Sequence, residues 1–118
     1  MPTLYSAKAE LFRTLAHPVR IRVLELLAER DHAVHELLAQ VDAEQSNLSQ
    51  QLAVLRRAGL VRQTRTGGEV VYSLLVPAVR ELLVAGRAVL RDRIQEEVGL
   101  GEELTRAASE SPGKADTA

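Results

Sequence analysis

The sequence predicts a mainly helical single domain that carries one β-hairpin, an α+β arrangement. Of its 118 residues, 46% are hydrophobic but only 3% are aromatic, so aliphatic side chains must build the core, which favours helices. Apolar residues recur at helical spacing along most of the chain. A stretch at 60–74 differs, because strand-like residues flank a glycine-rich turn there.

The first two helices are marked by apolar spacing and by a proline. Apolar residues recur at helical spacing from Leu4 to Leu15. Pro18 disfavours continuation of that helix and fits the first turn of a new one. We expect the second helix to run to about Arg30, and we expect His17 to form its start rather than to bind a ligand.

Two short helices follow, with a tight turn between them. Asp31 or His32 is positioned to cap a third helix, whose apolar residues lie at 34–41. An acidic break comes next and suits the N-terminal dipole of a fourth helix. We expect this helix at about 45–58, closed by Gly59 as a left-handed C-cap.

A β-hairpin is predicted directly after the fourth helix. Residues 60–65 and 69–74 have strand character, and the turn between them contains Gly67 and Gly68, which tolerate the positive φ that a tight hairpin needs. Two short helices joined by a tight turn and followed by a hairpin describe a winged helix-turn-helix.

The rest of the chain is expected to form a long terminal helix. Pro77 opens it, and the glycine-containing break at 99–101 is expected to end it. A short acidic helix at 102–108 would complete a domain spanning 1–108. The small and polar residues of 109–118 predict a disordered tail.

The composition excludes several classes of protein. The chain has no cysteine, which removes disulfides and thiolate metal sites. It has no apolar run long enough for a membrane span and no pattern of a secretory signal, so we expect a cytoplasmic protein. The net charge of −1 hides an uneven distribution: residues 1–91 hold 12 basic against 9 acidic side chains, and residues 92–118 hold 3 against 7.

The fourth helix has a polar face suited to the major groove of DNA. Leu48, Leu52 and Leu55 share one side of a helical wheel, and short uncharged polar residues occupy the other. Such side chains read base edges, while nearby arginines contact phosphates. The alternative is a solvated polar face, but the adjoining hairpin and arginines favour DNA. The predicted DNA-binding residues are Gln45, Ser46, Asn47, Ser49, Gln50, Arg56, Arg57, Arg62 and Arg65.

Three motifs occur in the order of a known family. Leu-Ala-His-Pro-Val-Arg stands at 15–20, Gln-Ser-Asn-Leu-Ser-Gln-Gln-Leu at 45–52, and an arginine, two glycines and Val-Tyr-Ser-Leu at 65–74. Together they resemble the opening, the recognition helix and the wing of the ArsR/SmtB family of bacterial repressors, over roughly residues 8–95. The family usually carries a histidine in place of Gln50 or Gln51, so the resemblance does not predict the base preference.

The resemblance implies a homodimer whose first and last long helices pack against their symmetry mates on a pseudopalindromic operator. Independently, the apolar stripe of the last helix is longer than so small a domain needs for its own core. The alternative is that the stripe lies entirely on that core. The predicted dimer interface comprises Leu4, Leu11, Leu82, Leu83, Gly86, Val89, Leu90 and Ile94.

Many members of the family release DNA when a metal binds. The helix site known in the family has lost nearly all its ligands here, since Asp92 is the single acidic residue at the matching positions. A cluster of Asp31, His32, His35 and Glu36 remains, and its ligand types suit nickel or zinc as an effector. In the other interpretation these are cap residues and a solvated helix start, and the effector is non-metallic or absent.

The sequence therefore predicts a sequence-specific, DNA-binding transcriptional regulator, most simply a repressor. The alternatives are a metal-independent regulator or activator and a winged-helix module for protein contacts. An enzyme is not expected. His35-Glu36 begins like the zinc-protease motif His-Glu-x-x-His, but Ala39 stands at the second ligand position, and no other catalytic motif occurs.

Overall fold

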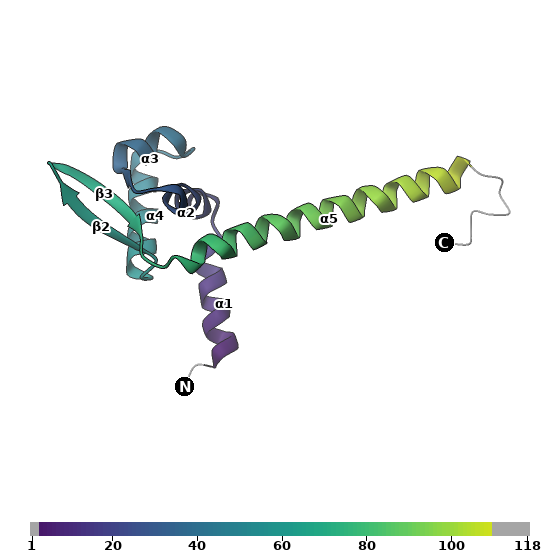
Figure 1. Ribbon diagram of the computed structural model, residues 1–118, viewed down its shortest axis with the longest axis horizontal. Coiled ribbons are helices and arrows are strands. Elements are labelled where there is room, and N and C mark those ends of the chain that lie inside the picture. The colour runs from purple at the N-terminus through teal and green to yellow at the C-terminus, as the bar shows by residue number, and fades with distance from the viewer. Residues whose placement is uncertain (1–2, 110–118) are drawn as a thin grey trace. The chain divides into compact units, whose positions relative to one another are not determined.

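A computed structural model describes residues 3–109 and confirms a mainly helical fold with a β-hairpin (Figure 1). One compact unit ends at Leu83 and a second begins at Val84, and each is described by itself. The predicted tail lies outside the described residues from position 110 on. The elements are α1 (Leu4–Leu15), α2 (Pro18–Glu29), β1 (His32–Ala33), α3 (Val34–Gln40), α4 (Gln45–Arg57), β2 (Val61–Thr66), β3 (Glu69–Leu74) and α5 (Ala78–Ser109).

The starts of α1 and α2 are fixed by side-chain caps. The Thr3 hydroxyl accepts from the Ser6 backbone N–H at 3.1 Å, and the Ser6 hydroxyl accepts from the Thr3 N–H at 2.9 Å. At α2, His17 Nδ1 accepts from the Val19 N–H at 3.2 Å. These bonds satisfy backbone donors that have no partner inside a helix. The predicted role of His17 at the start of the second helix is confirmed.

The predicted cap of the third helix is wrong. Neither Asp31 nor His32 caps α3, because the chain at His32–Ala33 is drawn into a short strand, β1, that pairs antiparallel with Tyr72 and Val71 of β3. The N-cap is instead Ala33, whose backbone N–H donates to Glu36 Oε1 at 2.9 Å. The sheet therefore has three strands in the order β1-β3-β2.

The hairpin forms as predicted. β2 and β3 pair antiparallel from Val61 opposite Leu74 to Thr66 opposite Glu69. Gly67 and Gly68 link the strands with φ values of +56° and +83°. Both angles lie in the left-handed region, which suits two-residue hairpin turns and favours glycine.

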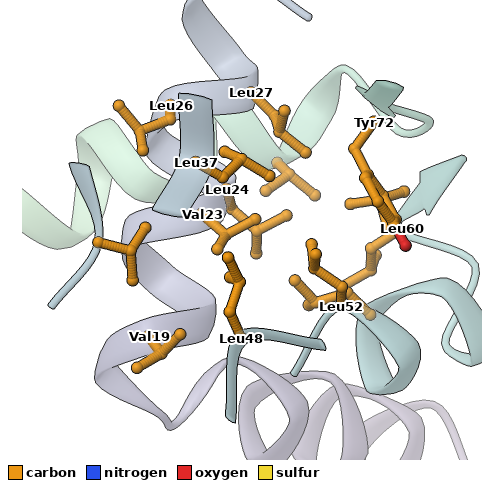
Figure 2. Close-up of a cluster of buried hydrophobic side chains, with 14 of the residues drawn as sticks. Val19, Val23, Leu24, Leu26, Leu27, Leu37, Leu48, Leu52, Leu60 and Tyr72 are labelled. Carbon is orange, nitrogen blue, oxygen red and sulfur yellow. The ribbon is translucent and has the colours of Figure 1, made fainter. Parts of the chain in front are cut away.

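The core of the first unit is aliphatic and joins all of its layers. Leu24 of α2, Leu37 of α3, and Leu48 and Leu52 of α4 are fully buried, and Tyr72 of β3 closes one side (Figure 2). The first turn of α5 belongs to this unit as well. Val79 is buried there, and Arg80 donates from Nε and Nη2 to the Ala28 carbonyl at 2.9 and 2.6 Å. The buried leucines of α4 thus attach this helix to the core, with its polar face directed outward.

The last helix does not end at the predicted break. α5 continues through Gly99 and Gly101 to Ser109, so the separate helix predicted at 102–108 is its final part. Neither glycine has a positive φ, and the Thr105 hydroxyl donates to the Gly101 carbonyl at 2.9 Å. A helical glycine costs only about 1 kcal/mol relative to alanine, which is too little to stop a helix by itself. Within residues 3–109, no helix is both long and apolar enough to cross a membrane.

Candidate nucleic-acid interface

Helix α4 buries one side and exposes the side predicted to face DNA. Leu48, Leu52 and Leu55 point into the core, where the helix packs against α2 and β2. The opposite side carries short polar side chains at its start and arginines at its end. Gln45, Ser46, Ser49, Gln50, Arg56 and Arg57 are all exposed.

The end of α4 leads directly into the wing. The Leu60 N–H donates to the Leu55 carbonyl and the Gly59 N–H to the Arg56 carbonyl, both at 3.0 Å, while Gly59 adopts a φ of +76°. This is the glycine-based helix stop that the sequence predicts. It turns the chain into β2, on which Arg62 and Arg65 are exposed.

Arg56 connects the helix to the wing. Its guanidinium donates to Gln63 Oε1 on β2. Its charge therefore sits between α4 and the hairpin, which lie beside each other in the first unit (Figure 1). The structure thus brings the predicted phosphate-contacting arginines Arg56, Arg57, Arg62 and Arg65 onto two adjoining elements.

Asn47 differs from the other predicted contact residues because its side chain is held from inside the protein. Gln51 Nε2 donates to Asn47 Oδ1 at 2.9 Å, and Arg20 Nε donates to Gln51 Oε1 at 2.8 Å. Arg20 Nη1 also donates to the Thr14 carbonyl in the last turn of α1, at 3.0 Å. Asn47 is half-buried and Gln51 is buried.

Sequence reasoning missed Arg20 and Gln51 as members of this site. A signal for Gln51 was present, since it lies four residues before Leu55 and so about 40° from it on a helical wheel. A polar residue on the apolar side of a helix needs a hydrogen-bonding partner. Nothing in the local pattern identified Arg20 as that partner, because 31 positions separate the two residues.

The two histidines of the predicted metal cluster lie in different surroundings and make different contacts. His32 is buried, with 1% of its surface exposed, and its Nδ1 lies 2.8 Å from the Arg30 carbonyl oxygen. His35 is exposed on α3, and its Nε2 lies 2.9 Å from Glu69 Oε1 at the start of β3. One histidine thus belongs to the core and the other to a surface contact with the wing.

The acidic members of that cluster do not join the histidines. Glu36 accepts from the Ala33 N–H and from Arg30 Nη2, at 2.9 and 3.2 Å, and these bonds, the first above all, lower its carboxyl pKa. Asp31 is exposed. In the part of the chain that the structure describes, no group of three or more such side chains is placed to hold a metal ion. The metal site stays a prediction that this geometry does not support.

The predicted dimer residues fall into two groups. Leu11, Leu82 and Leu83 are half-buried against the core of the first unit, whereas Leu4 is 72% exposed. A cavity of about 410 Å³ lies beside Leu11, between α1 and the end of α4. In the second unit Gly86, Val89, Leu90 and Ile94 are exposed along α5. The stripe therefore exceeds what the described core covers, and its role in a dimer stays a prediction.

The fold and the polar face of α4 define a winged helix-turn-helix protein. The arsR-family model of bacterial regulatory proteins matches residues 17–63, from the N-cap of α2 into the wing. Rv0081, an HTH-type transcriptional regulator of Mycobacterium tuberculosis, is 52% identical over 107 residues, or 90% of this chain and 94% of that protein. Its crystal structure matches with a TM-score of 0.75 and 54% identity, covering 83% of this chain and 99% of that one.

Two further relatives bear on function. The biofilm growth-associated repressor of Agrobacterium fabrum is 41% identical over 81 residues, 69% of each chain. The homodimeric winged helix-turn-helix DNA-binding domain Mb0332 of Mycobacterium bovis matches with a TM-score of 0.68 and 25% identity, covering 79% of this chain and 86% of that one. The chain belongs to the arsR family of bacterial regulatory proteins. It is a transcriptional regulator and not an enzyme, as the sequence predicts.

Proposed function

We propose that the chain is a homodimeric repressor that binds a pseudopalindromic operator through α4 and the wing. The observation that carries the proposal is the exposed start of α4, where uncharged polar side chains stand ahead of arginines on the adjoining wing. The Agrobacterium fabrum relative is a repressor, and the Mycobacterium bovis relative is a homodimeric DNA-binding domain. Both properties are part of the proposal for this chain.

The chemistry of α4 divides the work between base reading and phosphate contact. Glutamine, asparagine and serine hydrogen-bond to base edges, and the first turns of the second helix of a helix-turn-helix lie deepest in the major groove. Gln45, Ser46, Ser49 and Gln50 expose such groups in the first two turns. The exposed arginines of α4 and β2 supply the charge that phosphate binding needs and make that binding sensitive to salt.

The dimer follows from the apolar surface left on the long helix. A single recognition helix reads only a few base pairs, and two-fold dimers bind half-sites one helical turn apart. Val89, Leu90 and Ile94 are between 56% and 59% exposed in the second unit. Large apolar side chains arranged along one helix favour pairing with a second copy of that helix.

The proposal is tested by fluorescence anisotropy of the purified chain on the DNA immediately upstream of its own gene. We expect tight binding that weakens steeply as salt rises, and weaker binding to DNA of scrambled sequence. The double variant Ser49→Ala/Gln50→Ala should lose at least about tenfold in affinity for the upstream DNA only, the scale of losing base contacts. Gln40→Ala, an exposed glutamine on α3, is the matched control and should bind normally.

The same assay addresses the alternatives. Equal binding to both DNAs by the native chain and the double variant would contradict base reading by α4. Absence of salt-sensitive binding to any DNA would instead favour a winged-helix module for protein contacts. Nickel and zinc are added in separate titrations as effectors, with His32→Ala/His35→Ala as the comparison. Operator affinity that neither metal changes would favour a regulator that does not respond to nickel or zinc.

A further inference from the structure

Two hydrogen bonds link Arg20 to Gln51 and Gln51 to Asn47, and Arg20 determines which group donates in each. A guanidinium carries only donors, whereas a carboxamide has one donating and one accepting end. Arg20 Nε lies 2.8 Å from Gln51, so the end of Gln51 that faces it must be the oxygen. The Gln51 NH₂ is thereby turned toward Asn47, and the end of Asn47 facing it at 2.9 Å must be its oxygen.

The orientation of Asn47 follows from this order. With Oδ1 turned to Gln51, the NH₂ group of Asn47 is the end turned away from it. Among the hydrogen bonds of residues 3–109, this Nδ2 group donates to no protein acceptor. Asn47 lies in the first turn of α4, between the exposed Ser46 and the buried Leu48. Its two N–H donors are therefore available to a ligand that meets that turn.

Arg20 itself is anchored before it reaches Gln51. Its Nη1 donates to the Thr14 carbonyl at 3.0 Å, near the end of α1, where helix carbonyls lack intrahelical partners. The guanidinium is partly buried between the two bonds, and Gln51 is only 8% exposed. A planar group held at two points has little freedom to rotate, so the direction of the whole chain of bonds is fixed.

We propose that Arg20 is a positioning residue for DNA binding by α4, because it fixes Asn47 as a hydrogen-bond donor toward DNA. The acceptor is a base-edge atom such as guanine N7 or O6, adenine N7 or thymine O4, or else a phosphate oxygen. Arg20 does not touch DNA in this scheme and acts through Gln51. The DNA step rests on the proposed function above, while the orientation of Asn47 does not.

The orientation is tested without DNA, on the ¹⁵N-labelled full chain by NMR. In the native chain, the Gln51 side-chain NH₂ protons should exchange slowly with water, because they donate to Asn47, and those of Asn47 should exchange fast. In Gln51→Glu both oxygens accept, so Asn47 must turn its NH₂ inward and its side-chain protons should become the slow ones. Slow Asn47 and fast Gln51 protons in the native chain would overturn the assigned direction.

The DNA step is tested by anisotropy on the same upstream DNA and on scrambled DNA. Gln51→Glu, which presents the Asn47 oxygen outward, should weaken binding to the upstream DNA by about fivefold to twentyfold, the scale of one or two lost hydrogen bonds. A loss on both DNAs identifies a phosphate acceptor, and a loss on upstream DNA alone identifies a base. Unchanged affinity in a variant whose Asn47 has turned would overturn the role of Asn47.

Further variants at two positions, Gln51 and Arg20, separate positioning from charge and from folding. Gln51→Met adds no charge and removes the directing group, so its loss should lie between the native chain and Gln51→Glu. In Arg20→Met the Gln51 side-chain NH₂ protons should exchange faster with water. In Arg20→Lys the ammonium group still only donates, so part of the protection from exchange should remain. Arg22→Met is the matched control on α2, because Arg22 pairs only with Glu25 at 3.5 Å in the described structure. If the native protein binds the upstream DNA no more tightly than the scrambled DNA, the proposed function fails. The NMR result still decides the orientation of Asn47.

Discussion

Helix α4 and the part of α5 beyond residue 83 have similar apolar spacing, but their apolar side chains differ in burial. In α4 the leucines Leu48, Leu52 and Leu55 are at most 2% exposed, because α2, β2 and the rest of the first unit cover them. In α5 beyond residue 83, Val89, Ile94 and five other large apolar side chains are more than half exposed. An apolar stripe on a helix therefore predicts that other apolar residues pack against it. The stripe does not indicate whether those residues belong to the same chain.

The largest effect expected from this difference is on stability. Leu48→Ala should lower the free energy of unfolding by about 2–5 kcal/mol, because it leaves a cavity in a fully packed core. Val84→Ala, at a side chain 65% exposed on another side of α5 from the predicted dimer residues, should cost less than about 1 kcal/mol. Urea unfolding followed by circular dichroism measures both. Equal losses would show that the distal helix is covered as completely as α4.

The next effect concerns association. Ile94→Asp should raise the dissociation constant of the dimer by at least about 100-fold, because it places a charge in an apolar contact. Gln95→Asp adds the same charge one position away, on another side of the helix, and should leave the dimer intact. Sedimentation equilibrium distinguishes the two outcomes. A dimer that survives Ile94→Asp would place the interface elsewhere.

The smallest expected effect compares two glycines. Gly67 in the wing turn has a φ of +56°, so Gly67→Ala should cost about 1 kcal/mol of stability through backbone strain alone. Gly101 has a helical conformation with nothing within 4 Å of an added Cβ, so Gly101→Ala should increase the helix content of α5. Thermal unfolding and the circular dichroism signal at 222 nm report these opposite signs. Stabilisation by Gly67→Ala would mean that the turn differs from the one described.

Most of the secondary structure could be predicted because its causes are local. Apolar spacing marked the helices, Pro18 and Gly59 marked a start and an end, and Gly67 with Gly68 marked the hairpin turn. The polar face of α4 was found in the same way. The glycines near residue 100 misled the prediction, because a helical glycine weakens a helix without ending it.

Three features depended on residues far apart in the chain. His32 and Ala33 form a strand because Tyr72 and Val71 lie opposite, and the cap predicted at His32 is lost as a result. His35 contacts Glu69, 34 positions away, and is thereby separated from His32. Asn47 takes its orientation from Arg20 through Gln51.

By itself, the sequence determined the helices, the hairpin, the polar face of α4 and the family, because periodicity, caps and turn residues act within a few positions. The tertiary structure alone decided which apolar stripe is covered, which histidine is buried and how Asn47 is turned. These depend on contacts between segments tens of residues apart, such as Arg20 with Gln51 and Arg80 with Ala28. Such contacts form only when the chain has folded, so no local pattern encodes them.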